Sequence, residues 1–247
     1  MSHLLSLFAL PVLLTMLALQ PPDPQAIIDR TFEAHGAHLI ADSEINFDFR
    51  GRSFSVTHDG GSFDYARTYT DSTGVVLDVL NNEGFSRALN GTTVDLTERM
   101  LQFLPGSVNS VVYFAFLPHK LNDPAVRKRY LGLTAIKGEN YHAIEIKFAQ
   151  EGGGSDWSDV FIYWIHEERN TMDYLAYLYH VNGGGTRFRE AHNIRTIQGI
   201  RIADYRNYKA ESDALPLEEY ASAFSRGELI KVSDVDLEGV QVELTGK

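Results

Sequence analysis

The clearest pattern in the chain is a series of short apolar and aromatic runs between residues 131 and 208. The runs cover residues 143–148, 160–165, 172–179 and 200–208, and Gly, Asn or Asp residues separate them. Runs of strand length at intervals of roughly 8 to 14 residues, with no helical crossover between them, are typical of an antiparallel meander. The pattern therefore predicts a sheet, although it does not name a reaction.

The first folded segment is predicted to be a helix that begins after Asp23. Asp23 can cap the free N–H groups, Pro24 suits the first helical position, and Gly36 ends the helix. One face of this segment is mainly apolar and carries Ile27, Ile28, Thr31, Phe32 and His35. We expect that face to lie against the sheet.

From Glu44 onward, apolar residues alternate with polar ones, which is the pattern of a strand. The apolar parity switches after Gly51, so a bulge or a tight turn is expected there. Asn90 and Gly91 form the strongest hairpin signal of the chain, and residues 85–96 are predicted to pair around them.

Two helical pieces interrupt the predicted strands, at residues 97–104 and 108–117. Residues 111–117 are apolar or aromatic almost throughout, so the second piece should be buried on nearly all sides. Such a helix could fill the hollow of a curved sheet. The predicted fold class is mainly β (α+β): a single curved antiparallel sheet or an unclosed half-barrel, with an N-terminal helix and a buried central helix on the concave side.

The composition limits which partners the protein can bind and indicates the compartment in which it works. The chain has 247 residues, 44% of them hydrophobic, and a net charge of -11, which disfavours nucleic acid and anionic membrane surfaces. It has no cysteine, which excludes disulfides and thiolate metal sites. The apolar run at residues 4–19 is short for a bilayer span. We expect a signal peptide or an N-terminal apolar segment over residues 1–20, one β-rich domain over residues 21–247, and a periplasmic or secreted location.

This order of elements resembles that of the periplasmic lipoprotein carrier and the lipoprotein-sorting proteins, whose fold is an unclosed barrel with helices over its concave side. The motifs SVNSV at residues 107–111, LNDPAV at 121–126, TMDYLAY at 171–177 and GGGTRFR at 183–189 look like those of an uncharacterised family of Gram-negative envelope proteins. That resemblance covers about residues 23 to 210 and implies no activity or catalytic residues. Many of those relatives look lipid-anchored through a Cys, where this chain has Gln20.

The chemistry has to be inferred from strand parity, because the sequence contains no nucleophile elbow, no phosphate-binding loop and no HExxH motif. If residues 167–170 and 182–185 are hairpin turns, Trp164 faces Asp173, Tyr177 faces Glu190, and Tyr179 faces Phe188. One face of the sheet would then carry Trp164, His166, Asp173, Tyr177, Glu190 and His192. The opposite face would include Arg187 and Arg189, which share a parity and could bind a carboxylate or phosphate, although exposed edge positions are favoured.

On the first face, His166 with Asp173 and His192 with Glu190 are candidate acid–base pairs. The two histidines would be on the order of 13 Å apart, so we expect no metal site, and no cofactor signature is present. Solvated or structural roles are the favoured interpretation of all four residues.

Three functions remain open. The first is a non-enzymatic envelope protein that binds a lipid, an acyl chain or another hydrophobic small molecule. Its expected ligand-binding residues are Tyr113, Phe116, Trp164, Tyr177, Tyr179 and Phe188. The second is an envelope hydrolase or lyase that uses a His/carboxylate pair. The third is a structural or partner-binding module, and the oligomeric state is left open.

Overall fold

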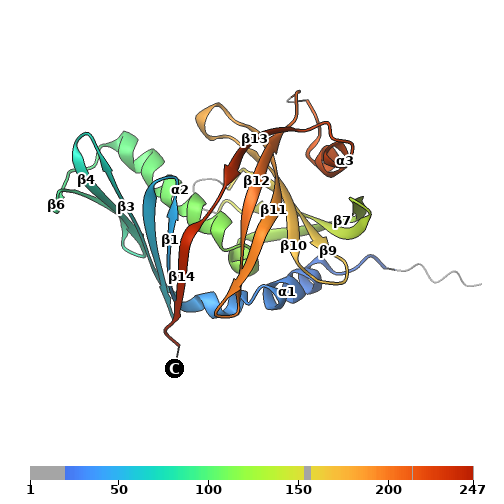
Figure 1. Cartoon of the computed structure of the whole chain (residues 1–247), viewed down its shortest axis with the longest axis horizontal. Helices are drawn as coiled ribbons and strands as arrows, with labels where there is room; N and C mark the ends of the chain where they lie inside the picture. Colours follow the sequence, from blue (N-terminus) through green and yellow to red (C-terminus); the bar gives the residue numbers. More distant parts are fainter. Residues whose placement is uncertain (1–19, 153–156, 213, 247) are drawn as a thin grey trace, which may run out of the picture.

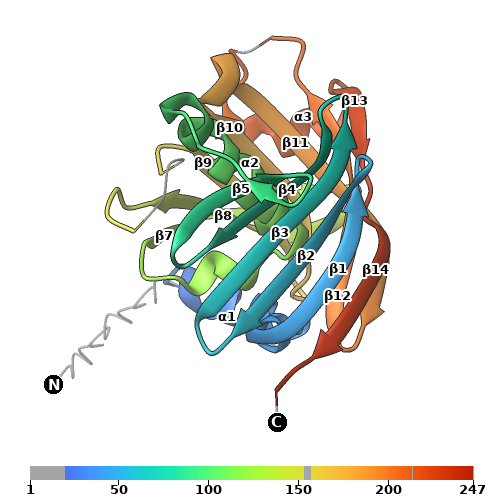
Figure 2. The ribbon, with the colours of Figure 1, turned by 90° about the vertical axis from the view of Figure 1, so that its left-hand side faces the viewer.

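The strands form two antiparallel sheets that face one another without closing into a barrel (Figures 1 and 2). The computed structural model describes residues 20–152, 157–212 and 214–246. The predicted apolar N-terminal segment, residues 1–20, lies outside the described residues except for Gln20. The mainly β, unclosed architecture that the sequence predicts is confirmed, with the strands divided between two seven-stranded sheets.

The first sheet has the strand order β14-β1-β2-β3-β4-β5-β6. Its strands are β1 (Asp42–Phe49), β2 (Arg52–Asp59), β3 (Ser62–Asp71), β4 (Gly74–Asn81), β5 (Gly84–Leu89), β6 (Thr92–Thr93) and β14 (Glu238–Leu244). The second sheet has the order β13-β12-β11-β10-β9-β8-β7. Its strands are β7 (Val126–Ile136), β8 (Glu139–Phe148), β9 (Val160–His166), β10 (Met172–Tyr179), β11 (Gly185–Ile197), β12 (Ile200–Lys209) and β13 (Ile230–Val235).

The C-terminal strands connect the two sheets. β13 pairs with β12 in the second sheet, and β14 then pairs with β1 in the first. Figure 1 shows this segment in red, running from one sheet to the other. The first and last parts of the chain are therefore held together, while β6 and β7 lie at the free edges.

Residues at the helix start and at the first turn determine the structure of the N-terminal segment. The helix α1 (Pro24–Ala34) starts as predicted, because the side chain of Asp23 accepts a hydrogen bond from the backbone N–H of Gln25 and Pro24 occupies its first turn. Arg50 and Gly51 both have positive φ and form a tight turn between β1 and β2. The turn explains the parity switch in the sequence.

The central helix α2 (Glu98–Ala115) is continuous, so the prediction of two helical pieces was wrong. Pro105 lies inside it and removes one backbone donor. Val108 and Val112 are buried against the first sheet on the C-terminal side of Pro105, and this packing holds the helix together across the proline. Thr97 caps the helix by accepting a hydrogen bond from the N–H of Met100, 3.3 Å away.

The described side chains pack in three apolar clusters. The first joins α1 and the inner face of the second sheet, and the second joins the inner face of the first sheet to α2. The third lies on the outer face of the second sheet, under the short helix α3 (Tyr220–Ser225). Figure 2 shows α2 behind the first sheet, in the space between the two sheets.

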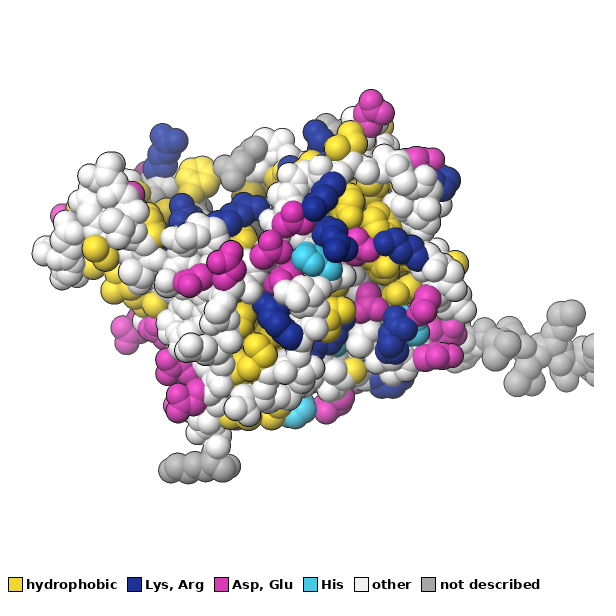
Figure 3. Space-filling view, viewed as in Figure 1, with side chains coloured by type: hydrophobic (Ala, Val, Ile, Leu, Met, Phe, Trp, Pro, Cys, Tyr) yellow, Lys and Arg dark blue, Asp and Glu magenta, His cyan; other side chains and the backbone are white. Residues whose placement is uncertain are grey.

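Acidic and basic side chains are interspersed with hydrophobic ones on the face shown in Figure 3. In the part of the chain that the structure describes, no helix is both long enough and apolar enough to span a membrane.

The end of α1 is joined to the second sheet at His35. Its Nε2 accepts a hydrogen bond from the backbone N–H of Met172, 3.0 Å away, and its carbonyl accepts one from the N–H of Arg201, 2.9 Å away. The next residue, Gly36, has a φ of 62°, and a Cβ there would meet the carbonyl oxygen of Gly199 at 2.1 Å. Only glycine permits this approach.

Burial, reinforced by the charge of Arg201, lowers the pKa of His35 to about 3. The unfolded chain binds a proton at this histidine below about pH 6.5, whereas the folded chain does not. Stability from this group is therefore complete above that pH and decreases as the pH falls towards 3. The pKa of His58 is lowered to about 4 by burial and by the nearby His119 and Lys120, so it acts in the same direction.

We predict that the free energy of unfolding decreases between pH 7 and pH 5, and that His35→Gln reduces this decrease by about 2 kcal/mol. The glutamine oxygen can still accept the Met172 hydrogen bond, but it does not titrate. Urea denaturation at each pH measures the effect, with His38→Gln as the control because His38 is exposed on the adjacent turn. A wild-type pH slope in His35→Gln would contradict the prediction.

Candidate functional site

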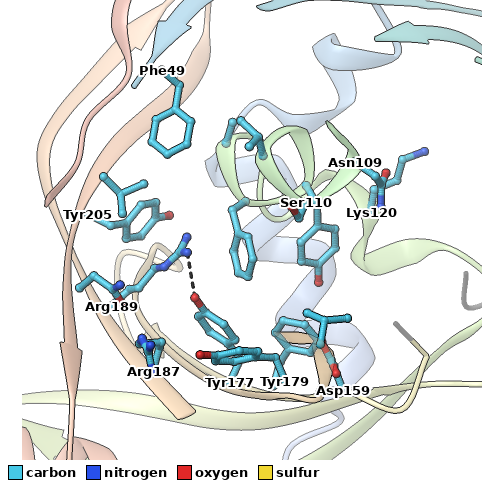
Figure 4. Close-up of a pocket in the computed structure, with 18 of the residues that line it drawn as sticks. Phe49, Asn109, Ser110, Lys120, Asp159, Tyr177, Tyr179, Arg187, Arg189 and Tyr205 are labelled. Atoms are coloured by element: carbon cyan, nitrogen blue, oxygen red, sulfur yellow. Dashed lines mark hydrogen bonds between the residues drawn. The ribbon is translucent and has the colours of Figure 1, made fainter. Parts of the chain in front are cut away.

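A cavity of about 660 Å³ lies between α2 and the inner face of the second sheet. Figure 4 shows side chains from β10, β11 and β12 on one side of it, with side chains of α2 opposite. Its lining includes Phe49, Asn109, Ser110, Tyr113, Phe114, Lys120, Phe148, Phe161, Tyr177, Tyr179, Arg187, Arg189 and Tyr205. Pockets of about 300 to 1,000 Å³ bury small ligands, so the size suits a ligand site.

The cavity has a wall of mutually packed aromatic rings. The ring of Phe114 on α2 lies 5.0 Å from that of Tyr177, and Phe161 lies 5.9 Å from Tyr177, both measured between centroids. Tyr113 and Phe148 pack at the edge of the same group, with centroids 6.3 Å apart. Rings held by one another present an apolar surface of fixed shape.

One hydrogen bond joins α2 to the second sheet across the aromatic layer. The hydroxyl oxygens of Tyr113 and Tyr163 are 2.7 Å apart. Burial raises the pKa of both phenols well above the ordinary value, so both remain protonated at any physiological pH. This bond joins α2 to the second sheet beside the cavity.

Arg189 extends from β11 into this aromatic layer and is only 9% exposed. Its guanidinium carbon lies 4.1 Å from the centre of the Phe114 ring, and Nη2 donates a hydrogen bond to the hydroxyl of Tyr177 at 2.9 Å (Figure 4). The sequence interpretation favoured an exposed edge position for this residue, which is wrong. Arg187, two residues earlier on the same strand, is half-buried beside Tyr179.

The predicted strand register was also wrong. Tyr177 faces Arg187 and Tyr179 faces Gly185, because the turn is a 3-10 segment (Val181–Gly183) capped by Gly184, and β11 already begins at Gly185. A register irregularity after Met172 also places Tyr174, not Asp173, opposite Trp164. Each predicted pairing is shifted by an odd number of residues. Side chains that were predicted to share a face of the sheet with a neighbouring strand's residues therefore lie on the opposite face from them.

The predicted ligand-binding residues separate into three places. Tyr113, Tyr177 and Tyr179 line the cavity. Phe116 packs against Phe47 in the cluster of the first sheet. Trp164 and Phe188 belong to the outer cluster under α3.

The four candidate acid–base residues each have a partner other than the predicted one. His166 bonds to Glu139 through Nε2, and its Nδ1 accepts the backbone N–H groups of Glu168 and Arg169 at 3.2 and 3.1 Å. Asp173 pairs with Arg201 at 2.8 Å.

His192 lies 3.5 Å from Asp236. Glu190 on the outer face bonds to Lys137 at 2.6 Å. Burial opposes ionisation of Glu190, but the Lys137 contact holds its pKa below the ordinary value. Catalysis by these residues stays a prediction. Among the described residues, no three His, Asp or Glu side chains are grouped to hold a metal ion.

A family of unknown function, DUF6503, matches residues 7–237. The chain belongs to this family. No curated protein matches the sequence.

Several solved structures are similar over nearly their whole length, at low identity. A LolA superfamily protein from Nitrosomonas europaea is 11% identical, with a TM-score of 0.49 over 90% of this chain and 92% of that chain. A putative outer membrane lipoprotein-sorting protein domain from Vibrio parahaemolyticus is 6% identical, with a TM-score of 0.48 over 91% of this chain and 95% of that chain. A DUF1329 family protein from Desulfovibrio piger is 12% identical, with a TM-score of 0.47 over 92% and 96%.

We predict that Tyr113→Phe and Tyr163→Phe each lower the free energy of unfolding by about 1 to 2 kcal/mol, because each leaves the other buried hydroxyl without its partner. The double variant should lose less than the sum of the two single variants, since it leaves neither hydroxyl unpaired. Urea denaturation of the four proteins measures this coupling. Strictly additive losses would show that the hydroxyls do not interact.

Proposed function

We propose that the protein binds an apolar or amphipathic ligand, a lipid or an acyl chain, in the cavity between α2 and the second sheet. The observation that carries the proposal is the aromatic wall formed by Phe114, Phe148, Phe161 and Tyr177 around a space of about 660 Å³. A well-packed interior contains few voids larger than a water molecule. A space of this size lined by rings is suited to a ligand with a large apolar part.

A non-enzymatic role is supported by the contacts of the candidate catalytic residues. Both ring nitrogens of His166 are engaged within its own turn and by Glu139. The ion pairs of Asp173 and Glu190 likewise account for their charge. None of the four candidate acid–base residues lines the cavity. A periplasmic or secreted location is supported by the apolar run at residues 4–19.

The test is to fill the cavity from α2. Ser110 lines the cavity and is partly exposed, so Ser110→Trp should occupy ligand space without disturbing the buried cores. We predict saturable binding of the neutral dye Nile red to the wild-type protein and loss of that binding in Ser110→Trp.

The matched control is Gln102→Trp, which adds the same ring to an exposed position of α2 outside the cavity. It should bind the dye as the wild type does. Mass spectrometry of lipid extracted from the purified proteins gives a second measurement, in which only Ser110→Trp should lack a bound lipid. Absence of saturable binding and of co-purified lipid in the wild type would refute the proposal.

A further inference from the structure

The cavity contains a buried positive charge with an incomplete set of partners. Arg189 is 9% exposed, and its Nε and Nη1 have no hydrogen-bond partner among the described residues. Only Nη2 forms a hydrogen bond, to the neutral hydroxyl of Tyr177. Within the described part of the chain, no carboxylate forms an ion pair with this guanidinium.

Two other arginines with buried side chains are neutralised. Arg67 is paired with the buried Asp78 at 2.6 Å. Arg201, whose side chain is 9% exposed, is paired with Asp173 at 2.8 Å. Taking a charge out of water without a partner is strongly unfavourable. Arg189 differs from these two arginines, and it lies in the wall of the cavity.

The lining as a whole is also more basic than the chain. Arg50, Lys120, Arg187 and Arg189 contribute to it, against the carboxylates of Asp123 and Asp159. The whole chain has 22 Lys and Arg against 33 Asp and Glu. In an acidic protein, a cavity with an excess of cationic side chains is complementary to an anion.

We propose that the ligand is an anionic amphiphile whose carboxylate or phosphate pairs with Arg189 inside the cavity. The inference deepens the proposed function and rests on it. The free Nε and Nη1 lie on different edges of the guanidinium, and each can donate a charge-assisted hydrogen bond to an oxyanion that approaches from its side. The apolar part of the ligand lies along Phe114, Phe148 and Phe161.

Two tyrosines complete the anion site. Tyr177 accepts its hydrogen bond from Arg189, so its own O–H proton is available for donation to the ligand. The side chain of Tyr205 points into the same space beside Arg189 (Figure 4). Burial raises the pKa of Tyr205, which keeps its hydroxyl protonated and able to donate.

The test compares three unbranched probes of twelve carbon atoms each: dodecanoate, dodecyl phosphate and 1-dodecanol. Each is titrated against the full protein carrying Nile red, at pH 8, and its dissociation constant is obtained from displacement of the dye. Wild-type protein should bind one or both anions roughly ten- to a hundredfold more tightly than dodecanol. The stronger anion identifies the headgroup as carboxylate or phosphate.

Arg189→Met should lose this preference and bind all three probes about as tightly as the wild type binds dodecanol. The control is Arg206→Met, which removes the same charge from the opposite face of the sheet, where Arg206 pairs with Glu190. It should keep the wild-type preference, which separates a local anion site from an effect of net charge. If Arg189→Met does not fold, Arg189→Lys replaces it and should reduce the preference without abolishing it.

The outcomes are distinguishable. Equal affinities of the wild type for the anions and for dodecanol, or an unchanged preference in the Arg189 variants, would overturn the anion site but leave apolar binding intact. Failure of all three probes to displace the dye or to bind would count against the proposed function itself.

Discussion

The structure depends on one helix covering two apolar surfaces at once. Because the two sheets do not close into a barrel, each has an inner face that must be removed from water, and α2 lies between them. Val108, Val112 and Ala115 face the first sheet, while Tyr113 and Phe114 pack against the second. The two sides of α2 therefore make different kinds of contact.

That difference accounts for the position of the cavity. Small side chains of α2 pack against the first sheet, where Phe47 and Phe54 stack with centroids 5.1 Å apart in the same cluster. On the other side, the rings of Tyr113 and Phe114 lie between the helix and the second sheet, and the hydrogen bond between Tyr113 and Tyr163 joins the two. Space remains beside the rings because a cylinder cannot follow the full width of a curved seven-stranded sheet.

Local chemistry could be predicted from the sequence where a few adjacent residues determine it. Asp23 caps α1, and Asn90 with Gly91 forms the turn between β5 and β6, because both signals need only their neighbours. The contents of the cavity could not be predicted, since they depend on register. The turn lies at Val181–Gly183 rather than at residues 182–185, and this difference shifts the pairing of β10 with β11. The sequence therefore placed Tyr177 and Arg189 on opposite faces, although the two are hydrogen-bonded.

The charged residues of β11 have different surroundings on the two faces of the sheet. Glu190 on its outer face is matched by Lys137 and Arg206, and the charge there is balanced within the fold. Its neighbour Arg189 on the inner face contacts the Phe114 ring and the Tyr177 hydroxyl, and its Nε and Nη1 have no hydrogen-bond partner among the described residues. Stability alone would favour either a carboxylate beside Arg189 or an apolar residue in its place. Glu190 is balanced by side chains of the fold, whereas Arg189 lies in the cavity wall, where the anionic group of the proposed ligand would be its counterion.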